Sequence, residues 1–415
     1  MVNKVIVGAQ WGDEGKAKIT DLMSANADLI IRYQGGCNAG HTVVVNGKTF
    51  KFHLIPSGIL YSGKTCFLGA GIVLHPETFQ KEITDLKEQG ISLSTLKISP
   101  LAAVTMPYHI ELDGANEKKA GKNKIGTTGK GIGPTYTDKI SRHGIRVEDL
   151  FSKDILGIKI EDAISRFDLK TTKSELMEKC SEYAEILSPY VDFNWQSTLR
   201  KFKSKKLLFE GAQGIMLDID YGTYPYVTSS NPIGGGACVG SGYGPKMIDE
   251  VIGVSKAYIT RVGEGPFITE LDNEIGTKIR EIGHEFGTTT GRPRRCGWFD
   301  GVVARYGVLV GGLTQMAITK LDVFDTFDEI KLCVAYKDTR NGNIMYDYPT
   351  NAFEHKYFEP VYETHAGWMQ DISNCKSFDE LPQNAKKYIK RLEEIFEIPI
   401  KIVSVGADRE QTILL

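Results

Sequence analysis

Two glycine-rich stretches near the start of the chain carry the residue types best suited to chemistry. The first, GAQWGDEGKAK, holds Asp13, Glu14 and Lys16, and the second, QGGCNAGHT, holds Asn38 and His41. Glycines let backbone N–H groups approach a phosphate closely, and a lysine adds a positive charge for its oxygens. These residues therefore predict a site for a phosphorylated ligand.

The elements around these stretches have the order of a parallel α/β sheet. Residues 2–8 are a β-branched run typical of a buried strand, residues 15–27 have helical spacing, and residues 28–33 form a second apolar run. Both glycine-rich stretches then fall at the carboxyl ends of strands, where such sheets bind ligands. The predicted fold class is α/β, with a large central and mostly parallel sheet flanked by helices and carrying helical and loop insertions.

Further elements follow along the chain. Residues 43–52 alternate around Asn46-Gly47, which is a strong signal for a hairpin. Strands are expected at 207–209, 257–262, 314–319 and 399–405, and helices at 76–89, 274–284 and 381–396.

The first glycine-rich stretch differs from a standard phosphate loop. Gly8 and Gly15 are seven positions apart, which is further than the standard motif allows, and Ala17 replaces the Ser or Thr that follows its lysine. Without that hydroxyl a carboxylate must hold Mg²⁺, and Asp13 and Glu14 are both placed to do so. The alternative is a tight strand-to-helix turn whose charges are only solvated.

Charge and cysteine content exclude several classes of protein. The chain has 415 residues and a formal net charge of -2, which argues against nucleic-acid or anionic-membrane binding. No apolar run is as long as a membrane span, and no signal-peptide pattern is found. Seven scattered cysteines without a Cys-x-x-Cys pair predict reduced thiols. We expect a cytoplasmic protein with a single domain over residues 1–415 and a helical insertion at about 150–200 that covers the sheet.

Two long strings go beyond these general patterns. VGAQWGDEGKAKITDL and IRYQGGCNAGHTVVVNGKTFKFHLIPSGIL closely resemble the adenylosuccinate synthetase family. That family condenses IMP with L-aspartate using GTP, in the first committed step from IMP to AMP. The resemblance continues through separate motifs from about Val5 to Arg409 and implies a GTPase-like nucleotide site. Cys37 stands where the family varies, near His41, which raises the question of thiol sensitivity.

The segment from Gly126 to Leu150 offers a second polar cradle. Its glycines, with Thr127, Thr128 and Lys130, supply hydroxyl and N–H donors, although residue types alone favour a plain glycine-rich connection. The resemblance implies that Thr128 contacts the IMP phosphate, and that Arg142 is donated to IMP across a dimer interface. The basic segment before it, residues 118–124, is expected to be a solvated loop.

The segment after residue 209 allows two interpretations from its residues. Glu210, Gln213, Asp218 and Asp220 could form an acidic metal site. Alternatively, the apolar residues 217 and 219 alternate as in a half-buried strand with structural carboxylates. The resemblance supports neither interpretation, because it implies that Gln213 and Thr228 bind IMP. A side-chain amide suits a purine, since it can donate to a ring oxygen and accept from a ring N–H.

Two later motifs concern carboxylate and guanine. Arg292, Arg294 and Arg295 follow a Thr-Thr-Thr-Gly loop, and arginine suits forked recognition of carboxylate or phosphate, although a basic surface turn is the simpler explanation. The resemblance implies that this loop closes over L-aspartate; Pro293 replaces an arginine of many members and has no role of its own. Lys320-x-Asp322 at a strand end resembles the guanine-reading motif of GTP-binding folds.

The resemblance implies the following residues for each role. Catalytic residues are Asp13, Lys16, His41 and Gln213. IMP-binding residues are Asp13, Glu14, Gly15, Lys16, Asn38, Ala39, Gly40, His41, Thr128, Arg142, Gln213, Thr228 and Arg292. GTP-binding residues are Gly12, Asp13, Glu14, Gly15, Lys16, Ala17, Lys18, Gly40, His41, Thr42, Arg294, Lys320, Leu321, Asp322, Ser404, Val405 and Gly406. Aspartate-binding residues are Thr288, Thr289, Thr290, Gly291, Arg292, Pro293 and Arg294. Ligands of one Mg²⁺ per subunit are Asp13 and Gly40.

The implied reaction has two steps. Asp13 removes the N1 proton of IMP, and the 6-oxygen attacks the γ-phosphate of GTP while His41 and Lys16 stabilise the developing charge. The aspartate amine then displaces phosphate from the 6-phosphoryl intermediate. The alternatives are a regulatory GTPase, which needs one nucleotide site, and a small-metabolite kinase, which does not require aspartate.

Overall fold

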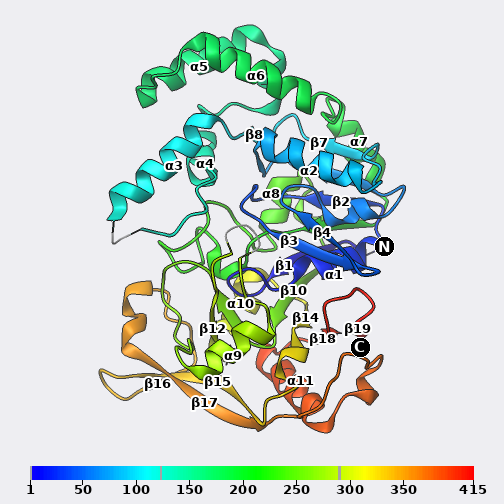
Figure 1. The fold of residues 1–415 in the computed structure, drawn as a ribbon, viewed down its shortest axis with the longest axis vertical. Helices are drawn as coiled ribbons and strands as arrows, with labels where there is room; N and C mark the ends of the chain where they lie inside the picture. The colour runs from blue at the N-terminus through cyan, green and yellow to red at the C-terminus, as the bar shows by residue number, and fades with distance from the viewer. Residues whose placement is uncertain (1, 122–123, 288–290) are drawn as a thin grey trace.

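One large sheet runs through the molecule. A computed structural model describes residues 2–121, 124–287 and 291–415. Within these ranges the sheet has nine strands in the order β19-β18-β14-β10-β1-β9-β2-β5-β7, all parallel to their neighbours except β18 and β19. Its strands stack from β7 in the upper part of Figure 1 to β18 and β19 in the lower part. In chain order they are β1 (Lys4–Gly8), β2 (Leu29–Arg32), β5 (Thr65–Leu68), β7 (Leu96–Ile98), β9 (Leu207–Glu210), β10 (Glu250–Lys256), β14 (Gln315–Thr319), β18 (Ile400–Ser404) and β19 (Thr412–Leu414).

The central strands are buried on both faces, as strands of a covered parallel sheet are. Ile6 of β1 belongs to the apolar core on one side of the sheet, while Val5 and Val7 belong to the core on the other side. Strand β2 repeats this alternation with Ile30 and Ile31. The prediction of an α/β fold with a mostly parallel sheet is confirmed.

Helices supply the other half of each core. The helices α1 (Lys16–Ser24) and α2 (Pro76–Glu88) bury side chains such as Ile19 and Phe79 in the first core. The helices α10 (Gly301–Gly311) and α11 (Gln383–Phe396) bury Ala304 and Tyr388 in the second. Since α1 begins directly after the first glycine-rich loop, it is placed to present its N-terminus to a ligand.

Smaller sheets surround the central one. The predicted hairpin is confirmed as β3 (His41–Val45) and β4 (Lys48–Phe52), which pair in antiparallel fashion around Asn46 and Gly47 at φ of 49° and 74°. A second sheet joins β15 (Glu329–Asp338) to β13 (Phe299–Asp300), β16 (Ile344–Met345) and β17 (Phe358–Ala366). The remaining pairs are β6 (Val73–Leu74) with β8 (Ala103–Val104), and β11 (Ile259–Arg261) with β12 (Arg295–Gly297).

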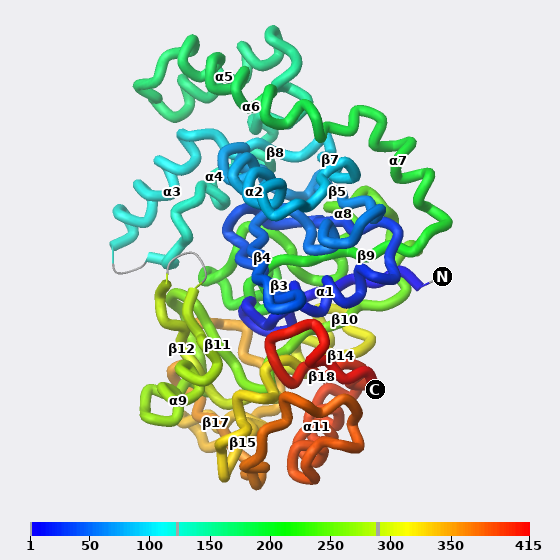
Figure 2. Tube along the Cα trace, turned by 45° about the vertical axis from the view of Figure 1, so that its right-hand side comes forward, coloured from blue at the N-terminus to red at the C-terminus, as the bar shows by residue number. Residues whose placement is uncertain are grey.

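The helical insertion lies away from the sheet. The helices α5 (Lys153–Phe167) and α6 (Lys173–Leu187) pack on each other and on the 3₁₀ turn Val147–Phe151, and α6 also contacts α2. Figures 1 and 2 place both helices at the end of the molecule furthest from β18. The expectation that this insertion covers the sheet was wrong, because α2 already occupies that face. Other helices are α3 (Pro107–Ala120), α4 (Ile132–Ser141), α7 (Trp195–Phe202), α8 (Gly236–Ser241) and α9 (Glu274–Ile282).

The strand considered for residues 217–219 is absent from this fully described segment. Residues Ile215–Leu217 form a 3₁₀ turn instead. Oδ1 of Asp218 accepts hydrogen bonds from the backbone N–H groups of Asp220 and Tyr221 at 2.9 and 3.0 Å, which closes a turn. Asp218 is thus a structural carboxylate. In the part of the chain that the structure describes, we find neither a cluster of three acidic, histidine or cysteine side chains fit for a metal nor a helix able to cross a membrane.

Candidate active site

The first loop folds around the buried carboxylate of Glu14. Its Oε1 accepts hydrogen bonds from the N–H groups of Gln10 (3.1 Å) and Gly12 (2.8 Å), and its Oε2 lies 2.5 Å from Nζ of Lys16. Both charged groups are buried, and buried charges persist in proteins when they are paired. Glu14 is therefore occupied in the loop itself, so Asp13 is the one of the two predicted Mg²⁺ carboxylates that is not used inside the loop.

The glycines of this loop are needed for two physical reasons. A Cβ at Gly8 would lie 2.3 Å from Oε2 of Glu14 and 2.6 Å from the carbonyl oxygen of Gln213, so no side chain fits there. Gly12 and Gly15 have φ of 90° and 85°, in the left-handed region that glycine adopts without strain. The backbone of the loop can therefore approach a ligand, as the sequence predicts.

Asp13 contacts an arginine that is distant in the sequence. Its Oδ2 lies 2.8 Å from Nε of Arg294, and Nη1 of Arg294 lies 2.6 Å from Oε2 of the buried Glu285. Asp13 itself has φ of 60°, a conformation that few non-glycine residues adopt. Two predicted site residues, Asp13 and Arg294, are thus in direct contact.

His41, the first residue of β3, is oriented by a buried carboxylate. Its Nδ1 lies 2.7 Å from Oε1 of Glu210, whose other oxygen accepts from the N–H and hydroxyl groups of Ser57 at 2.9 and 3.2 Å. Burial lowers the pKa of His41, although the hydrogen bond to Glu210 opposes this. The neutral ring therefore donates through Nδ1, and its buried Nε2 has no hydrogen-bond partner among the described residues. Nε2 is the ring atom left for a ligand.

The second loop meets the segment after β9. Nε2 of Gln213 donates to Oδ1 of Asn38 at 3.1 Å, and Oε1 of Gln213 accepts from Nε2 of Gln34 at 2.9 Å. Oδ1 of Asn38 also accepts from the N–H of Gly36 at 3.2 Å. The predicted IMP residues Asn38 and Gln213 are therefore neighbours.

Lys18 joins the first helix to the C-terminal turn. Its Nζ donates to Oγ of Ser404 (2.7 Å) and to the carbonyl oxygens of Gly406 (2.8 Å) and Gln411 (2.9 Å). Burial lowers the pKa of Lys18 to about 8. The N–H of Val405 donates to the carbonyl oxygen of Gln411, which completes this turn.

The Lys-x-Asp motif lies next to that turn. Lys320 has φ of 60° and donates through Nζ to the carbonyl oxygen of Gly283 at 2.8 Å, and Leu321 is buried. Burial raises the pKa of Asp322, against the opposing charges of Lys320 and Lys18. Its Oδ1 is buried and has no hydrogen-bond partner among the described residues. An unpartnered buried acceptor of this kind suits a ligand that brings donors.

The segment from Gly126 is tethered by carboxylates of α3. Asp113 accepts from Oγ1 of Thr127 (3.0 Å) and from the N–H of Gly131 (2.9 Å). Glu117 accepts from three successive N–H groups, those of residues 125–127. Thr128, between these anchors, is exposed. The segment is therefore a shaped loop with an accessible tip, not an unconstrained connection.

Arg142 follows α4 and lines a pocket of mixed charge. It has φ of 71° and is exposed. The charged residues that line this cavity of about 220 Å³ are Lys139, Arg142, Arg146, Glu148, Asp149 and Lys159.

The other predicted site residues lie on the same loops. Ala17 is buried in α1, and the carbonyl oxygen of Ala39 accepts from Nδ1 of His53 at 2.7 Å. Gly40 precedes β3, Thr42 is exposed on it, and the N–H of Thr228 donates to the carbonyl oxygen of residue 217 at 2.8 Å. Thr288, Thr289 and Thr290 lie outside the described residues, and the exposed residues that follow them are Gly291, Arg292 and Pro293.

Comparison with known proteins identifies the family. Residues 5–413 match the family described as adenylosuccinate synthetase. The chain belongs to the adenylosuccinate synthetase family. It is 54% identical over its whole length to the adenylosuccinate synthetase of Picosynechococcus sp., covering 96% of that protein, and 53% identical to that of Prochlorococcus marinus strain MIT 9312, covering 97%.

Solved structures agree. The fully ligated adenylosuccinate synthetase of Plasmodium falciparum superposes with a TM-score of 0.94 at 40% identity, with both chains covered completely. A cyanophage S-2L succinoaminodeoxyadenylate synthetase shares the fold alone, with a TM-score of 0.64 at 17% identity. As an adenylosuccinate synthetase, the protein is a GTP-dependent ligase that forms a C–N bond between IMP and L-aspartate, in AMP biosynthesis.

Two buried charged residues next to the adenylosuccinate synthetase site were not predicted. Lys256 ends β10, and Glu285 immediately precedes the arginine-bearing loop. The sequence signal for Lys256 is its place at the end of an apolar strand run. Glu285 has no such signal. A third unpredicted residue, Arg32, is fully buried with Nη1 3.7 Å from Oε1 of Glu210, so it adds positive charge behind the carboxylate that orients His41.

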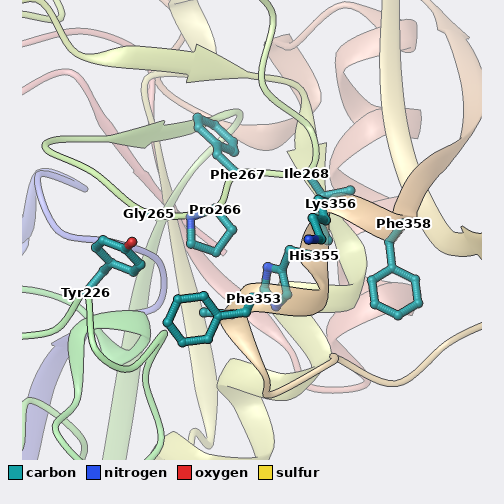
Figure 3. A pocket seen from close by; sticks show the side chains of 10 residues that line it. Tyr226, Gly265, Pro266, Phe267, Ile268, Phe353, His355, Lys356 and Phe358 are labelled. Atoms are coloured by element: carbon teal, nitrogen blue, oxygen red, sulfur yellow. The ribbon is translucent and has the colours of Figure 1, made fainter. Parts of the chain in front are cut away.

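A second cavity, larger than the one beside Arg142, contains no residue of the predicted site. It measures about 500 Å³, and Figure 3 shows Tyr226, Pro266 and Phe267 facing Phe353 and His355 across it. None of its lining residues is among those predicted to bind IMP, GTP or L-aspartate. The cavity and the predicted site therefore have no residue in common.

Proposed function

We propose that the loops around Asp13 carry out the two-step ligation with the residue roles that the sequence predicts. The observation that carries this proposal is the contact of Asp13 with Arg294, on a loop whose other charged groups, Glu14 and Lys16, are paired with each other. The Asp13 side chain is also 29% exposed, whereas Glu14 is fully buried, so Asp13 is the carboxylate of this loop that a ligand can reach. A general base must reach the proton that it removes, and Asp13 takes that role at N1 of IMP.

His41 and Lys16 act on the phosphoryl group as it moves from GTP to the 6-oxygen of IMP. The buried Glu210 fixes the His41 ring through Nδ1, so that Nε2 can face the transferred group. The negative charge of the phosphates favours a proton on Nε2, which then donates to the phosphoryl oxygens. Phosphoryl transfer depends on positioning and on stabilisation of charge, which these fixed groups supply. Gln213 and Asn38 then hold the purine, and Thr128, Thr228 and Arg292 hold the rest of IMP.

GTP and L-aspartate occupy the two remaining parts of the site. The turn around Ser404 and the residues 320–322 hold the guanine end of GTP, with Arg294 on the nucleotide as well. The loop from Thr288 to Arg294 holds L-aspartate, whose amine displaces phosphate from the 6-phosphoryl intermediate.

The residues present fit one Mg²⁺ per subunit. Mg²⁺ is commonly bound through one or two carboxylates together with substrate phosphates, so a dedicated acidic cluster is not required. Asp13 and the carbonyl oxygen of Gly40 would hold the ion, and both are hard oxygen donors. When bound, it neutralises charge on the phosphates of GTP.

We also propose a cytoplasmic homodimer in which Arg142 of one subunit serves IMP in the other. All seven cysteines are described and unpaired, which supports a reducing compartment. Arg142 is exposed at the end of α4, as a side chain that reaches another subunit must be, which supports a role in trans.

One assay tests the reaction and the role of Asp13 together. The purine ultraviolet spectrum is followed with IMP, GTP, L-aspartate and Mg²⁺, and each is omitted in turn. We expect a requirement for all four, and loss of roughly 10²-fold or more of turnover in Asp13→Asn with the fold retained. Phosphate release from GTP without IMP and aspartate would instead support a regulatory GTPase. Near-normal turnover in the folded variant would remove Asp13 from its role.

A further inference from the structure

A series of ion pairs between oppositely charged side chains ends at Asp13. Lys256 and Glu285 are both fully buried, with Nζ of Lys256 2.7 Å from Oε1 of Glu285. The other oxygen of Glu285 lies 2.6 Å from Nη1 of Arg294, and Nε of Arg294 lies 2.8 Å from Oδ2 of Asp13. The order along this series is positive, negative, positive, negative.

Lys256, Glu285 and Arg294 each make a further hydrogen bond that fixes their position. Oε1 of Glu285 also accepts from the hydroxyl of Tyr258 at 2.5 Å, and Nζ of Lys256 donates to Oγ1 of Thr260 at 2.7 Å. The N–H of Arg294 donates to the carbonyl oxygen of Glu285 at 2.8 Å. The positive groups of Lys256 and Arg294 hold the pKa of Glu285 at about 2 in spite of its burial. Glu285 is therefore a fixed negative charge at working pH.

A second link joins this assembly to the first loop. Nε2 of Gln10 donates to the carbonyl oxygens of Lys256 (3.4 Å) and Tyr258 (3.0 Å), and Oε1 of Gln10 accepts from the N–H of Lys256 at 3.4 Å. Gln10 is three residues from Asp13 in the same loop. The backbone that carries Asp13 and the guanidinium that touches its carboxylate are thus anchored to the same buried pair.

We propose that Lys256 and Glu285 are positioning residues that set the carboxylate of Asp13 through Arg294. A guanidinium presents its N–H groups in a rigid fork. With Nη1 fixed on Glu285, the place of Nε is fixed as well, and with it the oxygen of Asp13 that Nε contacts. The other carboxylate oxygen, Oδ1, is then directed to the ligand. The inference rests on the proposed role of Asp13 as the base of the first step.

The first step can be measured without the second. With IMP and Mg²⁺ present and L-aspartate absent, reversible transfer of the γ-phosphoryl group leaves a GDP whose β-phosphoryl group can rotate before the transfer reverses. GTP labelled with ¹⁸O in the β,γ-bridge then moves its label to the β-nonbridging positions. This exchange reports phosphoryl transfer, which depends on Asp13, and not the attack of aspartate.

Glu285→Gln keeps the shape of the side chain and removes its charge. We expect the exchange rate to fall on the order of 10-fold to 100-fold, since a misplacement of about 1 Å can cost roughly 10²-fold in rate. A pair that only anchors the aspartate loop would leave exchange unchanged and raise the KM for L-aspartate, and this result would overturn the proposal.

A double variant separates positioning from stability. Glu285→Gln alone leaves Lys256 as an unpaired buried charge, which destabilises proteins strongly. Lys256→Met with Glu285→Gln removes both charges, so we expect the melting temperature to recover while exchange stays low. Recovery of both would show that the pair is only structural and would overturn the proposal.

Two further variants complete the experiment. Asp300→Asn is the matched control, because Asp300 is an equally buried carboxylate whose hydrogen-bond partners are Val302, Val303 and Tyr336. It is expected to keep the wild-type exchange rate, and a loss like that of Glu285→Gln would overturn the proposal. Asp13→Asn tests the premise. If it retains exchange, the proposed function of Asp13 fails; if it loses exchange while Glu285→Gln does not, only the present inference fails.

Discussion

Asp322 carries a buried carboxylate oxygen that none of the described residues satisfies. Leaving a buried polar atom unpaired costs about 1–3 kcal/mol, which a ligand with donors can recover. Guanine offers two donors, N1–H and the 2-amino group, and a carboxylate accepts both. Xanthine keeps N1–H but replaces the amino group with a carbonyl oxygen, which Asp322 would repel. The unpartnered oxygen thus fits the proposed role of Asp322 in selecting GTP over XTP.

Asp322→Asn should shift the nucleotide preference from GTP towards XTP. The side-chain oxygen of Asn still accepts from N1–H, while its NH₂ group meets the carbonyl of xanthine and opposes the amino group of guanine. Discrimination by one unpaired polar contact of this kind is worth on the order of 1–3 kcal/mol. We expect GTP efficiency to fall about tenfold or more, at ~1.4 kcal/mol per decade, and XTP to become usable. Values of kcat/KM for both nucleotides on both proteins decide it, and an unchanged preference for GTP places the guanine site elsewhere.

His41 should titrate below the range of a free histidine in the ligand-free enzyme. Burial lowers its pKa, so the folded protein binds this proton less well than the unfolded chain does. The contribution of the neutral ring to stability is therefore present above an unfolded pKa of about 6.5 and is lost as the pH falls through the folded value. The ring nitrogens of ¹⁵N-labelled protein report the titration directly. A polyanionic phosphate near Nε2 should raise the value when IMP and GTP bind, and a ligand-free value above that of free histidine contradicts the assignment.

At the scale of elements, one helix shapes a loop that has no regular structure of its own. Two carboxylates on successive turns of α3 accept hydrogen bonds from residues 125–131 and hold Thr128 between them. The α3 helix is therefore as much a part of the proposed IMP site as the loop that it holds. This role was not predicted from the sequence, because Asp113 and Glu117 look like ordinary charges of a solvated helix.

Asp113→Ala should weaken IMP binding more than catalysis. The change leaves the buried N–H of Gly131 without its acceptor, at a cost on the order of 1–3 kcal/mol, and releases the hydroxyl of the exposed Thr127. We expect the KM for IMP to rise about tenfold, which corresponds to ~1.4 kcal/mol, with kcat at saturation within about twofold. Glu111→Ala, on an exposed position of the same helix, is the matched control. An unchanged KM for IMP means that the loop keeps its shape without Asp113.

Sequence patterns predicted the elements that depend on residues close together in the sequence. The strand, glycine loop and helix from residue 4 to Ser24 follow from β-branched runs and from positions that only glycine fits, and the hairpin follows from Asn46 and Gly47. The alternation around Asp218 misled, because one carboxylate closes a turn that outweighs a short strand pattern. Lys256 and Glu285 could not be predicted together, since the two are paired only by the packing of β10 against a distant loop.

The burial of Cys37 likewise depends on packing that the sequence does not reveal. Its position near His41 raised the question of thiol sensitivity, yet its side chain is buried. Burial raises the pKa of the Cys37 thiol, which disfavours the reactive thiolate at neutral pH. Proximity in sequence to a site residue did not reveal that the side chain points into the core. Only the packing of the whole sheet decides that.

At the scale of the whole molecule, α4 and α8 each carry a strongly exposed apolar side chain. Ile140, on the last turn of α4, is 76% exposed, and Val239 of α8 is 86% exposed. Large exposed apolar groups are often covered in oligomers, and soluble homo-oligomers are most often twofold dimers. A twofold contact through α4 would cover Ile140 and place Arg142 against the other subunit.

Hybrid dimers test whether Arg142 acts in trans. Arg142→Leu removes the donated arginine, and Asp13→Asn removes the base, so each variant alone has two defective sites. In a hybrid, the subunit with an intact Asp13 receives Arg142 from its partner, which rebuilds one of the two sites. Random exchange makes about half of the dimers hybrid, so we expect about a quarter of wild-type activity in an equal mixture of twofold dimers. Subunit exchange is verified independently with differently tagged chains. If exchange is complete and the mixture stays inactive, each subunit completes its own site, and Arg142 belongs to IMP binding in cis or to none.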